Sequence, residues 1–353
     1  MSFSERSSDS ISYAQALYEA AYLEMERDPT VFVYGLGVDD PKGMYGSTLD
    51  LHKTFGPNRC FDTPLAEDAM TGLGVGAAMA GMRPIHVHQR MDFLLLCMNQ
   101  LVNMAAKMGY MTDGAVNVPF VSRGIIGRSW GQGAQHSQAF HSYFMHVPGI
   151  RVVAPSTPHD AKGCMIASIR DNNPVVFMEH RMLYSNQGIV PREAYEVPFG
   201  KARVLTTGND VTIVAVSHMV VEAIRARHLL SEVGIEAEVI DPVSLSPLDI
   251  DTILTSVRKT KKLVVVDTSW LPCGVGSEII CRVLEEAGDD FRFQAKRLGY
   301  EPTPCPTTRT LEDLYYPSSG TIAQEVYKLS GGTDDWCPKF QVASEIEEFR
   351  GPF

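Results

Sequence analysis

The chain has 353 residues, which is enough for two domains at the usual size of about 150 residues each. Apolar residues make up 44% and charged residues 21%, so the chain can bury a sizeable core and lacks the composition of a disordered protein. Acidic residues outnumber basic ones by 42 to 31, and the net charge of -11 argues against a surface that binds nucleic acid or anionic membranes.

No run of about 18 apolar residues predicts a membrane span, and the polar N-terminus resembles neither a secretory signal nor an arginine-rich transit peptide. The seven cysteines are scattered and form no C-x-x-C pair. This excludes the common structural zinc spacings and a dense disulfide framework. We therefore expect a cytoplasmic protein with reduced thiols.

Helical and strand patterns alternate along the first half of the chain. The apolar periodicity predicts helices at 11–29, 63–82, 93–111 and 159–172. Thr63 and Pro64 suit the cap and first position of the second helix. Buried strands are expected at 30–37, 83–88, 118–127, 151–157 and 173–180. This alternation is typical of a mostly parallel sheet with helices on both faces.

A stretch without periodicity at 185–200, containing prolines and glycines, separates a second α/β pattern from the first. The second pattern predicts strands at 210–217, 236–242 and 262–269 and helices at 219–234 and 247–261. We predict two doubly wound α/β domains, at residues 1–190 and 201–335, joined by a linker at 191–200 and followed by a tail at 336–353.

The chain shows no loop for nucleotide phosphates. The G-x-x-x-x-G-K-[ST] pattern is missing, and the glycine spacing at 72–81 falls inside a predicted helix. Glycines at such positions permit close helix packing. The chain is therefore not expected to hold a nucleotide phosphate by itself.

Glu67 stands near the start of a predicted helix whose residues are almost all apolar or small. Burial there would raise the pKa of its carboxyl towards neutrality, as suits a proton donor or a hydrogen-bond partner. A solvated acid favoured by the helix dipole explains the same position, so the pattern leaves both interpretations open.

His136, His141 and His146 are spaced five residues apart, which turns successive side chains by about 140° on a helix and excludes a shared zinc-binding face. His136 follows a glycine-rich loop, where an imidazole can reach a cleft and transfer a proton or bind a carboxylate. A packing or capping role is the alternative. His86 and His88 share one face of a predicted strand, but no third metal ligand stands at motif spacing.

Residues 127–131 read G-R-S-W-G, the pattern of a nucleophile elbow with Ser129 as the nucleophile. The strand before it agrees with that interpretation. The glycine-rich residues after it are a poor start for the helix that must carry an oxyanion-hole amide. A serine hydrolase therefore stays an alternative.

Three segments resemble, in the family's order, the β subunit of the thiamine-diphosphate-dependent first component of 2-oxoacid dehydrogenases of the pyruvate, branched-chain and acetoin types. They are F-D-T-P-L-A-E at 61–67, the apolar helix at 93–111, and the stretch that begins with G-A-Q-H-S-Q at 133–138 and continues to residue 180. The second α/β pattern is similar to the family's transketolase-like C-terminal domain. The resemblance covers about residues 12–330.

The resemblance implies a pyrimidine-binding domain followed by the C-terminal domain in this chain, while a separate α subunit holds the diphosphate and Mg²⁺. The missing phosphate loop agrees with this division. The complete enzyme would be a heterotetramer of two α and two β chains, with β–β contact and thiamine diphosphate at the α/β interfaces. A lipoyl acyltransferase is the implied acceptor of the acyl group.

By the same resemblance, Glu67 matches the glutamate of the T-P-x-x-E motif, which hydrogen-bonds ring nitrogen N1′ of the cofactor's aminopyrimidine. His136 matches the histidine of the H-S-Q motif, which binds the substrate carboxylate or assists acyl transfer. The segment S-I-R-D-N-N-P resembles a potassium-binding turn. Its implied ligands, mainly backbone carbonyls, belong to Phe120, Ser168, Asp171 and Asn173.

The strand before the long apolar helix departs from the family pattern. Val87 stands where an acid is usual, and Arg90 or Met91 falls where an aromatic stacks on the pyrimidine. The Met91 thioether can still contact the ring. Phe93 does so with a register shift, and Gln89 is a further expected cofactor contact.

Arg90 and His88 would instead recruit an acidic substrate. We predict the β subunit of an enzyme that decarboxylates a 2-oxoacid and passes the acyl group to an acceptor such as a lipoyl carrier. The alternatives are a carboligase or acetoin-cleaving enzyme that uses the same cofactor, a serine hydrolase that uses Ser129, and a non-catalytic regulatory partner of an α-like subunit.

Overall fold

The computed structural model describes residues 9–128 and 131–338. They fold into two compact units. The first unit contains residues 9–127 and 143–199, and the second contains residues 128, 131–142 and 200–338. The segment 131–142 therefore groups with the second unit, although it precedes the linker expected at 191–200 by some fifty residues.

The first unit is built on parallel strands in the order β6-β7-β5-β4-β2-β3. These strands are β2 (Val31–Gly35), β3 (Cys60–Phe61), β4 (Arg83–His88), β5 (Val121–Ile126), β6 (Arg151–Val153) and β7 (Val175–His180). They are largely buried, as parallel strands between two helical layers are. Two short strands, β1 (Ser10–Ser12) and β8 (Gln187–Ile189), pair antiparallel beside them.

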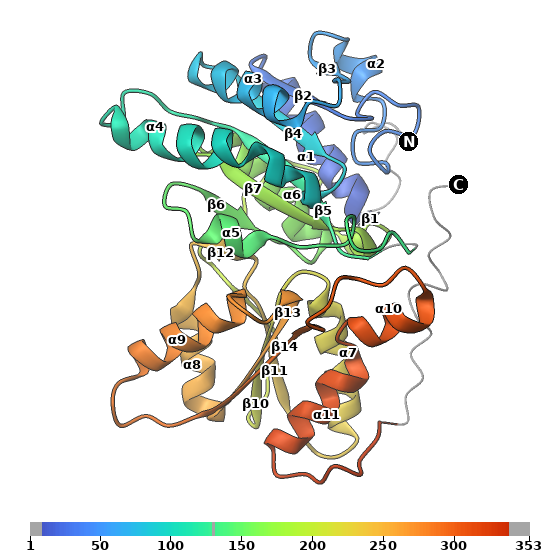
Figure 1. Ribbon diagram of the computed structural model, residues 1–353, viewed down its shortest axis with the longest axis vertical. Helices are drawn as coiled ribbons and strands as arrows, with labels where there is room; N and C mark the ends of the chain where they lie inside the picture. The colour runs from blue at the N-terminus through green and yellow to red at the C-terminus, as the bar shows by residue number, and fades with distance from the viewer. Residues whose placement is uncertain (1–8, 129–130, 339–353) are drawn as a thin grey trace. The chain divides into compact units, whose positions relative to one another are not determined.

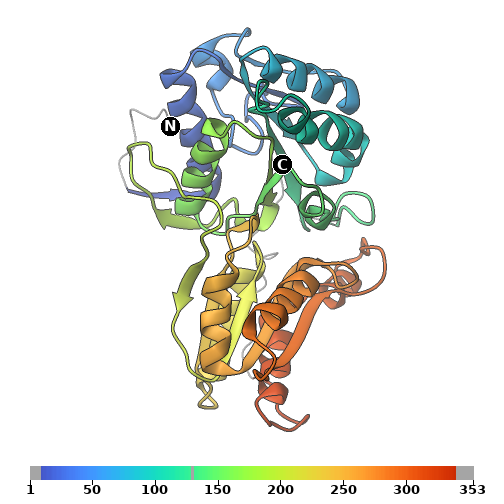
Figure 2. The ribbon, with the colours of Figure 1, turned by 90° about the vertical axis from the view of Figure 1, so that its left-hand side faces the viewer.

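Helices cover both faces of this sheet (Figures 1 and 2). On one face α1 (Tyr13–Arg27) packs on α6 (Pro158–Arg170), and on the other α3 (Glu67–Met79) packs on a helical run at 91–111. The shorter helices are α2 (Leu51–Phe55), α5 (His141–Met145) and η4 (Arg181–Leu183). The parallel sheet and its two helical layers are those that the sequence pattern predicts.

The run at 91–111 is not the single α-helix that the sequence predicts. It consists of the 3-10 segment η2 (Met91–Cys97), the π-helical segment η3 (Asn99–Ala105) and α4 (Ala106–Met111). The buried side chains explain the change of pitch, because they recur every three residues through η2 and every four thereafter: Met91, Leu94, Cys97, Leu101 and Ala105.

The predicted start of α3 is also wrong. The helix begins at Glu67 rather than at Thr63, and Ala66 occupies the cap position without a side-chain hydrogen bond. The Ala66 amide already donates to the Pro64 carbonyl at 2.9 Å, in a tight turn that precedes the helix. Glu67 therefore stands in the first helical position, where backbone amides have no partner within the helix.

The second unit is a sheet in the order β14-β13-β10-β11-β9, in which only β9 runs antiparallel to its neighbour. Its strands are β9 (Arg203–Thr206), β10 (Val211–Ala215), β11 (Ala237–Asp241), β13 (Lys262–Trp270) and β14 (Gln294–Tyr300). A further short strand is β12 (Ser244–Ser246).

Helices flank this second sheet in two pairs (Figure 1). α7 (Met219–Ser231) packs on α11 (Ser319–Leu329), and α8 (Ile250–Thr260) packs on α9 (Val275–Ala287). A core of Val, Ile, Leu and Ala side chains lies between the sheet and the α7–α11 pair. The sequence analysis did not predict β9, β14, α9, α10 (Arg309–Tyr315) or α11.

None of the helices in the described residues is both long and apolar enough for a membrane span. All seven cysteines are free thiols.

Candidate active site

Glu67 is half-buried at the first position of α3, and its neighbour Asp68 is exposed. Within the described residues the Glu67 carboxylate makes no hydrogen bond or ion pair, whereas the Glu67 carbonyl accepts a hydrogen bond from the Cys97 thiol at 3.2 Å. Burial raises the pKa of Cys97 to about 11, so this thiol keeps its proton. The main chain at Glu67 is therefore fixed, while no side chain or backbone group among the described residues binds its carboxylate.

The first two turns of α3 are held by β2 and β4. The Tyr34 hydroxyl donates to the Met70 carbonyl at 2.9 Å, and Thr71 Oγ1 lies 3.2 Å from His86 Nδ1. The rings of Tyr34 and His86 stack at 4.3 Å. A Cβ atom at Gly74 would lie 2.0 Å from the Tyr34 hydroxyl, so the prediction that glycines in this helix permit close packing is confirmed at Gly74.

His86 and His88 form a buried pair on β4, with ring centroids 4.0 Å apart. Burial lowers the pKa of His88 to about 3. Burial and the neighbouring His88 hold the pKa of His86 well below its usual range. Both imidazoles are therefore neutral at physiological pH. Within the described residues, His88 Nε2 is buried without a hydrogen-bond partner, so His88 can offer a substrate a hydrogen bond but no charge.

The residues after β4 differ in how far they are exposed. Gln89 is exposed and donates to the Leu36 carbonyl at 3.4 Å. Met91 is fully buried, whereas Phe93 is half-buried on η2, which packs against α3. Arg90 is only 3% exposed, and its guanidinium donates to the Gly127 carbonyl at 3.0 Å. Gln89 and Phe93 are thus more accessible than Met91 and Arg90.

His136 lies in the second unit, whereas Glu67 lies in the first. It is half-buried in an irregular segment, and its backbone amide donates to the Gly133 carbonyl at 3.4 Å. Ser137 and Ala139 beside it are buried. The histidine is therefore carried by a packed loop.

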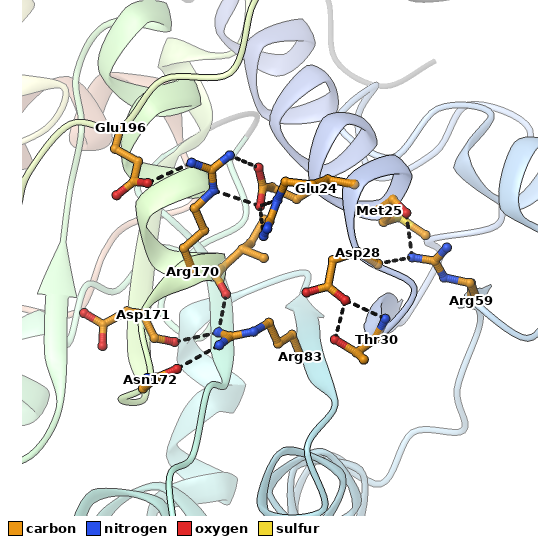
Figure 3. A network of polar contacts seen from close by, with 12 residues as sticks. Glu24, Met25, Asp28, Thr30, Arg59, Arg83, Arg170, Asp171, Asn172 and Glu196 are labelled. Carbon is orange, nitrogen blue, oxygen red and sulfur yellow. Dashed lines mark hydrogen bonds and ion pairs between the residues drawn. The ribbon is translucent and has the colours of Figure 1, made fainter.

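The turn that the sequence assigns to potassium is held by Arg83 (Figure 3). Its guanidinium donates to the carbonyls of Ile169 and Asp171, at 2.9 and 3.0 Å, and to the Asn172 side chain at 2.7 Å. The Asp171 carboxylate accepts two hydrogen bonds from Asn173, at 2.8 and 2.7 Å, and pairs with Arg151 at 2.5 Å. An arginine therefore supplies positive charge directly at this turn.

The other two expected potassium ligands are fully buried. The Ser168 hydroxyl donates to the Cys164 carbonyl at 2.6 Å, and the Phe120 carbonyl accepts from the Val175 amide at 2.8 Å. Each carbonyl oxygen has a second lone pair, so these hydrogen bonds leave oxygen donors for a cation. The potassium site itself stays a prediction, and Arg83 already binds the Asp171 carbonyl that was expected to be one of its ligands.

Ser129 lies outside the described residues, and the nucleophile elbow stays a prediction. In the part of the chain that the structure describes, no group of three or more His, Cys, Asp and Glu side chains could hold a metal ion.

The sequence analysis did not predict the contacts of Thr71 and Cys97 that hold the first turns of α3 in place. Cys97 on η2 donates to the Glu67 carbonyl, and Thr71 on α3 contacts the buried His86. One signal was available in the sequence. Asp267 ends a run of valines in a predicted buried strand, where an unpaired acid is costly, and it does bind a histidine, His141.

Two family models match the chain. The pyrimidine-binding domain of transketolase matches residues 9–187, and the C-terminal domain of transketolase matches residues 200–322. The β subunit of the acetoin:2,6-dichlorophenolindophenol oxidoreductase of Cupriavidus necator is 43% identical over 91% of this chain and 98% of its own. The pyruvate dehydrogenase E1 β subunit of Rickettsia felis is 41% identical over 90% of this chain and 98% of its own.

The chain belongs to the family of E1 β subunits of pyruvate dehydrogenases and acetoin oxidoreductases.

A solved structure described as an inactive β4 tetramer of a split-gene transketolase matches this E1 β chain with a TM-score of 0.75 at 21% identity, over 91% of this chain and 98% of its own. The predicted family and the predicted fold, two α/β domains of the transketolase type, are therefore confirmed. Members of this family depend on thiamine diphosphate, and a β subunit implies an α partner. A related E1 β subunit of Arabidopsis thaliana, 42% identical over 88% of this chain and 86% of its own, is named mitochondrial, and the cytoplasmic location stays a prediction.

Proposed function

We propose that this E1 β chain and an α subunit together form an enzyme that uses thiamine diphosphate to decarboxylate a 2-oxoacid and passes the acyl group to an acceptor such as a lipoyl carrier. Cleavage of acetoin by the same machinery is the second candidate. The acetoin relative is 43% identical and the pyruvate dehydrogenase relatives are 41–42% identical, so the identities favour neither substrate.

The Glu67 carboxylate carries this proposal, because it is half-buried at the start of α3 without a partner in the described residues. We assign to it the hydrogen bond with ring nitrogen N1′ of the aminopyrimidine, where it holds the proton that the ring needs to change tautomer. Thiamine diphosphate, when bound, supplies the nucleophilic carbon and the electron sink for decarboxylation. We assign Phe93, which is half-buried on η2 where it packs against α3, and the exposed Gln89 as further cofactor contacts, with the buried Met91 between them in sequence.

We assign to His136 a role in substrate binding or acyl transfer. An imidazole in a packed loop can bind the carboxylate of a 2-oxoacid or move a proton during acyl transfer. His88 is neutral and buried, so in this proposal it accepts or donates a hydrogen bond and attracts no anion.

Exposed apolar side chains support the proposal of a partner subunit. Leu73 on α3 and Leu65 just before it are 51% and 78% exposed, and Leu96 and Met104 on the run at 91–111 are 58% and 42% exposed. Large apolar side chains gathered on neighbouring helices mark protein contacts. We propose that the α subunit or a second β chain covers them, within a heterotetramer of two α and two β chains.

A potassium ion at the 168–173 turn is part of the same proposal. Backbone carbonyls can replace the hydration shell of this ion, and those of Phe120, Ser168, Asp171 and Asn173 are the expected ligands. Because Arg83 already binds the Asp171 carbonyl, we expect the ion to add less stability than in a turn without an arginine.

The test uses the chain assembled with its α subunit. Wild-type protein should bind thiamine diphosphate in calorimetry and should reduce 2,6-dichlorophenolindophenol with pyruvate, another 2-oxoacid or acetoin as substrate. Glu67→Gln should lower turnover by at least about 100-fold, because it removes a charge that acts in the transition state. The matched control is Asp68→Asn, an exposed acid in the same turn, which should leave turnover unchanged.

Equal activity of Glu67→Gln and wild type would refute the assignment. An assembly that binds its α subunit but no thiamine diphosphate would instead favour the regulatory partner. A fluorophosphonate label on Ser129 of active protein would favour the serine hydrolase.

A further inference from the structure

The segment that carries His136 is fixed to the second unit at its start. Gly131 and Gly133 have positive φ angles of 74° and 71°. A Cβ atom would lie 2.7 Å from the Thr307 carbonyl oxygen at Gly131, and 2.8 Å from Thr307 Oγ1 at Gly133. Side chains at either position would therefore push the segment off Thr307.

The same segment is fixed again at its end, by β13. Ser269 Oγ donates to the Ala139 carbonyl at 2.9 Å, and His141 Nε2 lies 3.0 Å from Asp267 Oδ1. Ser269 and Asp267 are two residues apart on β13, and both side chains contact the segment. The other Asp267 oxygen accepts from the Val275 amide at 3.3 Å, at the first turn of α9.

The bond between His141 and Asp267 is completely enclosed. His141 is 0% and Asp267 2% exposed. Within the described residues, His141 Nδ1 is buried without a hydrogen-bond partner, so Asp267 makes the polar contact that orients this ring. Loss of this contact would leave the buried Asp267 carboxylate with only its hydrogen bond from the Val275 amide among the described residues. The ring therefore has one strongly preferred position.

We propose that His141, held by Asp267, is a positioning residue for His136. This inference rests on the role of His136 in the proposed function. His136 lies midway between the two anchors, in a stretch with no helix or strand, so the anchors define where its imidazole lies. A displacement of about 1 Å at a catalytic group can reduce the rate by about 100-fold. His141 itself is enclosed by protein and needs no contact with substrate or cofactor.

The test compares variants of the assembled α/β enzyme in the dye-reduction assay, with pyruvate and acetoin as probes. His141→Leu removes the bond to Asp267 and should lower kcat/KM by about 10- to 100-fold. His141→Gln places an amide near the position of Nε2 and should restore most of the activity. The matched control is Thr268→Val on the opposite face of β13, which removes a buried 2.8 Å bond to the Tyr300 hydroxyl and should leave kcat/KM close to wild type.

The decisive measurement repeats His141→Leu in a His136→Ala background. A positioning residue acts through His136, so its loss should add little once His136 is gone. If His141→Leu lowers kcat/KM in the His136→Ala background by as much as it does in wild type, the inference is overturned while the proposed function stands. If His136→Ala alone leaves the activity unchanged, the assigned role of His136 fails first.

A chemical-modification experiment, which does not depend on turnover, completes the test. Carbethoxylation of His136 by diethyl pyrocarbonate, followed by peptide mass spectrometry, should change in rate in His141→Leu and not in Thr268→Val. If His141→Leu does not fold, Ser269→Ala breaks the neighbouring anchor to Ala139 and should show the same dependence on His136. An unchanged carbethoxylation rate in a folded anchor variant would contradict the inference.

Discussion

Two glycines of α3 should respond in opposite ways to the same substitution. A Cβ atom at Gly74 would lie 2.0 Å from the Tyr34 hydroxyl and 2.6 Å from the Phe120 ring, whereas a Cβ atom at Gly76 would have no neighbour within 4 Å. Tyr34 is 0% exposed and stacks on His86, so it cannot move aside without disturbing β4. Gly74→Ala therefore strains the core, and Gly76→Ala does not.

The magnitudes follow from the contacts. Overpacking at Gly74 costs about 1–3 kcal/mol. Displacing Tyr34 breaks its 2.9 Å bond to the Met70 carbonyl, which costs about 1–3 kcal/mol when the carbonyl stays buried. The gain in helix propensity from Gly to Ala is about 1 kcal/mol. We expect Gly74→Ala to lose about 3 kcal/mol of unfolding free energy, and Gly76→Ala to gain up to about 1 kcal/mol.

Urea unfolding of the isolated chain, followed by circular dichroism, measures both variants against wild type. Because the strained contact lies one turn after Thr71, Gly74→Ala should also weaken binding of thiamine diphosphate in the assembled enzyme. A Gly74→Ala variant as stable as Gly76→Ala would show that α3 does not pack on Tyr34 as described, and the support assigned to Glu67 would be lost with it.

Two further predictions concern the buried imidazole of His88 and the turn at 169–172 that Arg83 binds. His88 has a pKa of about 3 in the folded chain against 6.5 when unfolded, so its contribution to stability is complete above pH 6.5 and is lost as the pH falls towards 3. At pH 4 the titration of His88 should lower the free energy of unfolding by about 3 kcal/mol. In urea unfolding, His88→Leu should therefore lose less unfolding free energy between pH 7 and pH 4 than wild type does. Equal losses in the two proteins would contradict the assignment. Arg83→Met removes three hydrogen bonds from the 169–172 turn and should lower Tm. Its Tm should then rise more with KCl than with choline chloride, and an equal response to both salts would count against a potassium site.

The parallel α/β architecture of both units could be predicted from the sequence, because parallel strands between two helical layers appear as apolar runs bounded by helical periodicity. The order of the strands in each sheet was not predicted. The pitch of the run at 91–111 could not. Apolar residues lie on most sides of that segment, and only the packed structure shows which of them are buried at intervals of three and which at intervals of four.

The candidate site was predictable in part. Glu67 and His136 stay candidates, which the local pattern left open and the T-P-x-x-E and H-S-Q motifs of the resemblance singled out. The contacts behind them join distant segments: Cys97 to Glu67, and Asp267 to His141. Such contacts are set by tertiary packing and leave no periodic trace. For the same reason the sequence placed residues 131–142 in the first domain, although their hydrogen bonds run to β13.

Arg90 illustrates how burial changes the interpretation of a charge. The sequence assigns this arginine to an acidic substrate, but its side chain is enclosed and donates to the Gly127 carbonyl at 3.0 Å. Burial lowers the pKa of Arg90, as expected where a charge has lost water. Arg90→Lys separates the two roles, because it keeps the charge and loses the planar donor geometry. If Arg90 binds substrate, KM should rise with Tm unchanged. If it holds the main chain at the end of β5, Tm should fall with KM unchanged, and this second result is the one that the geometry favours.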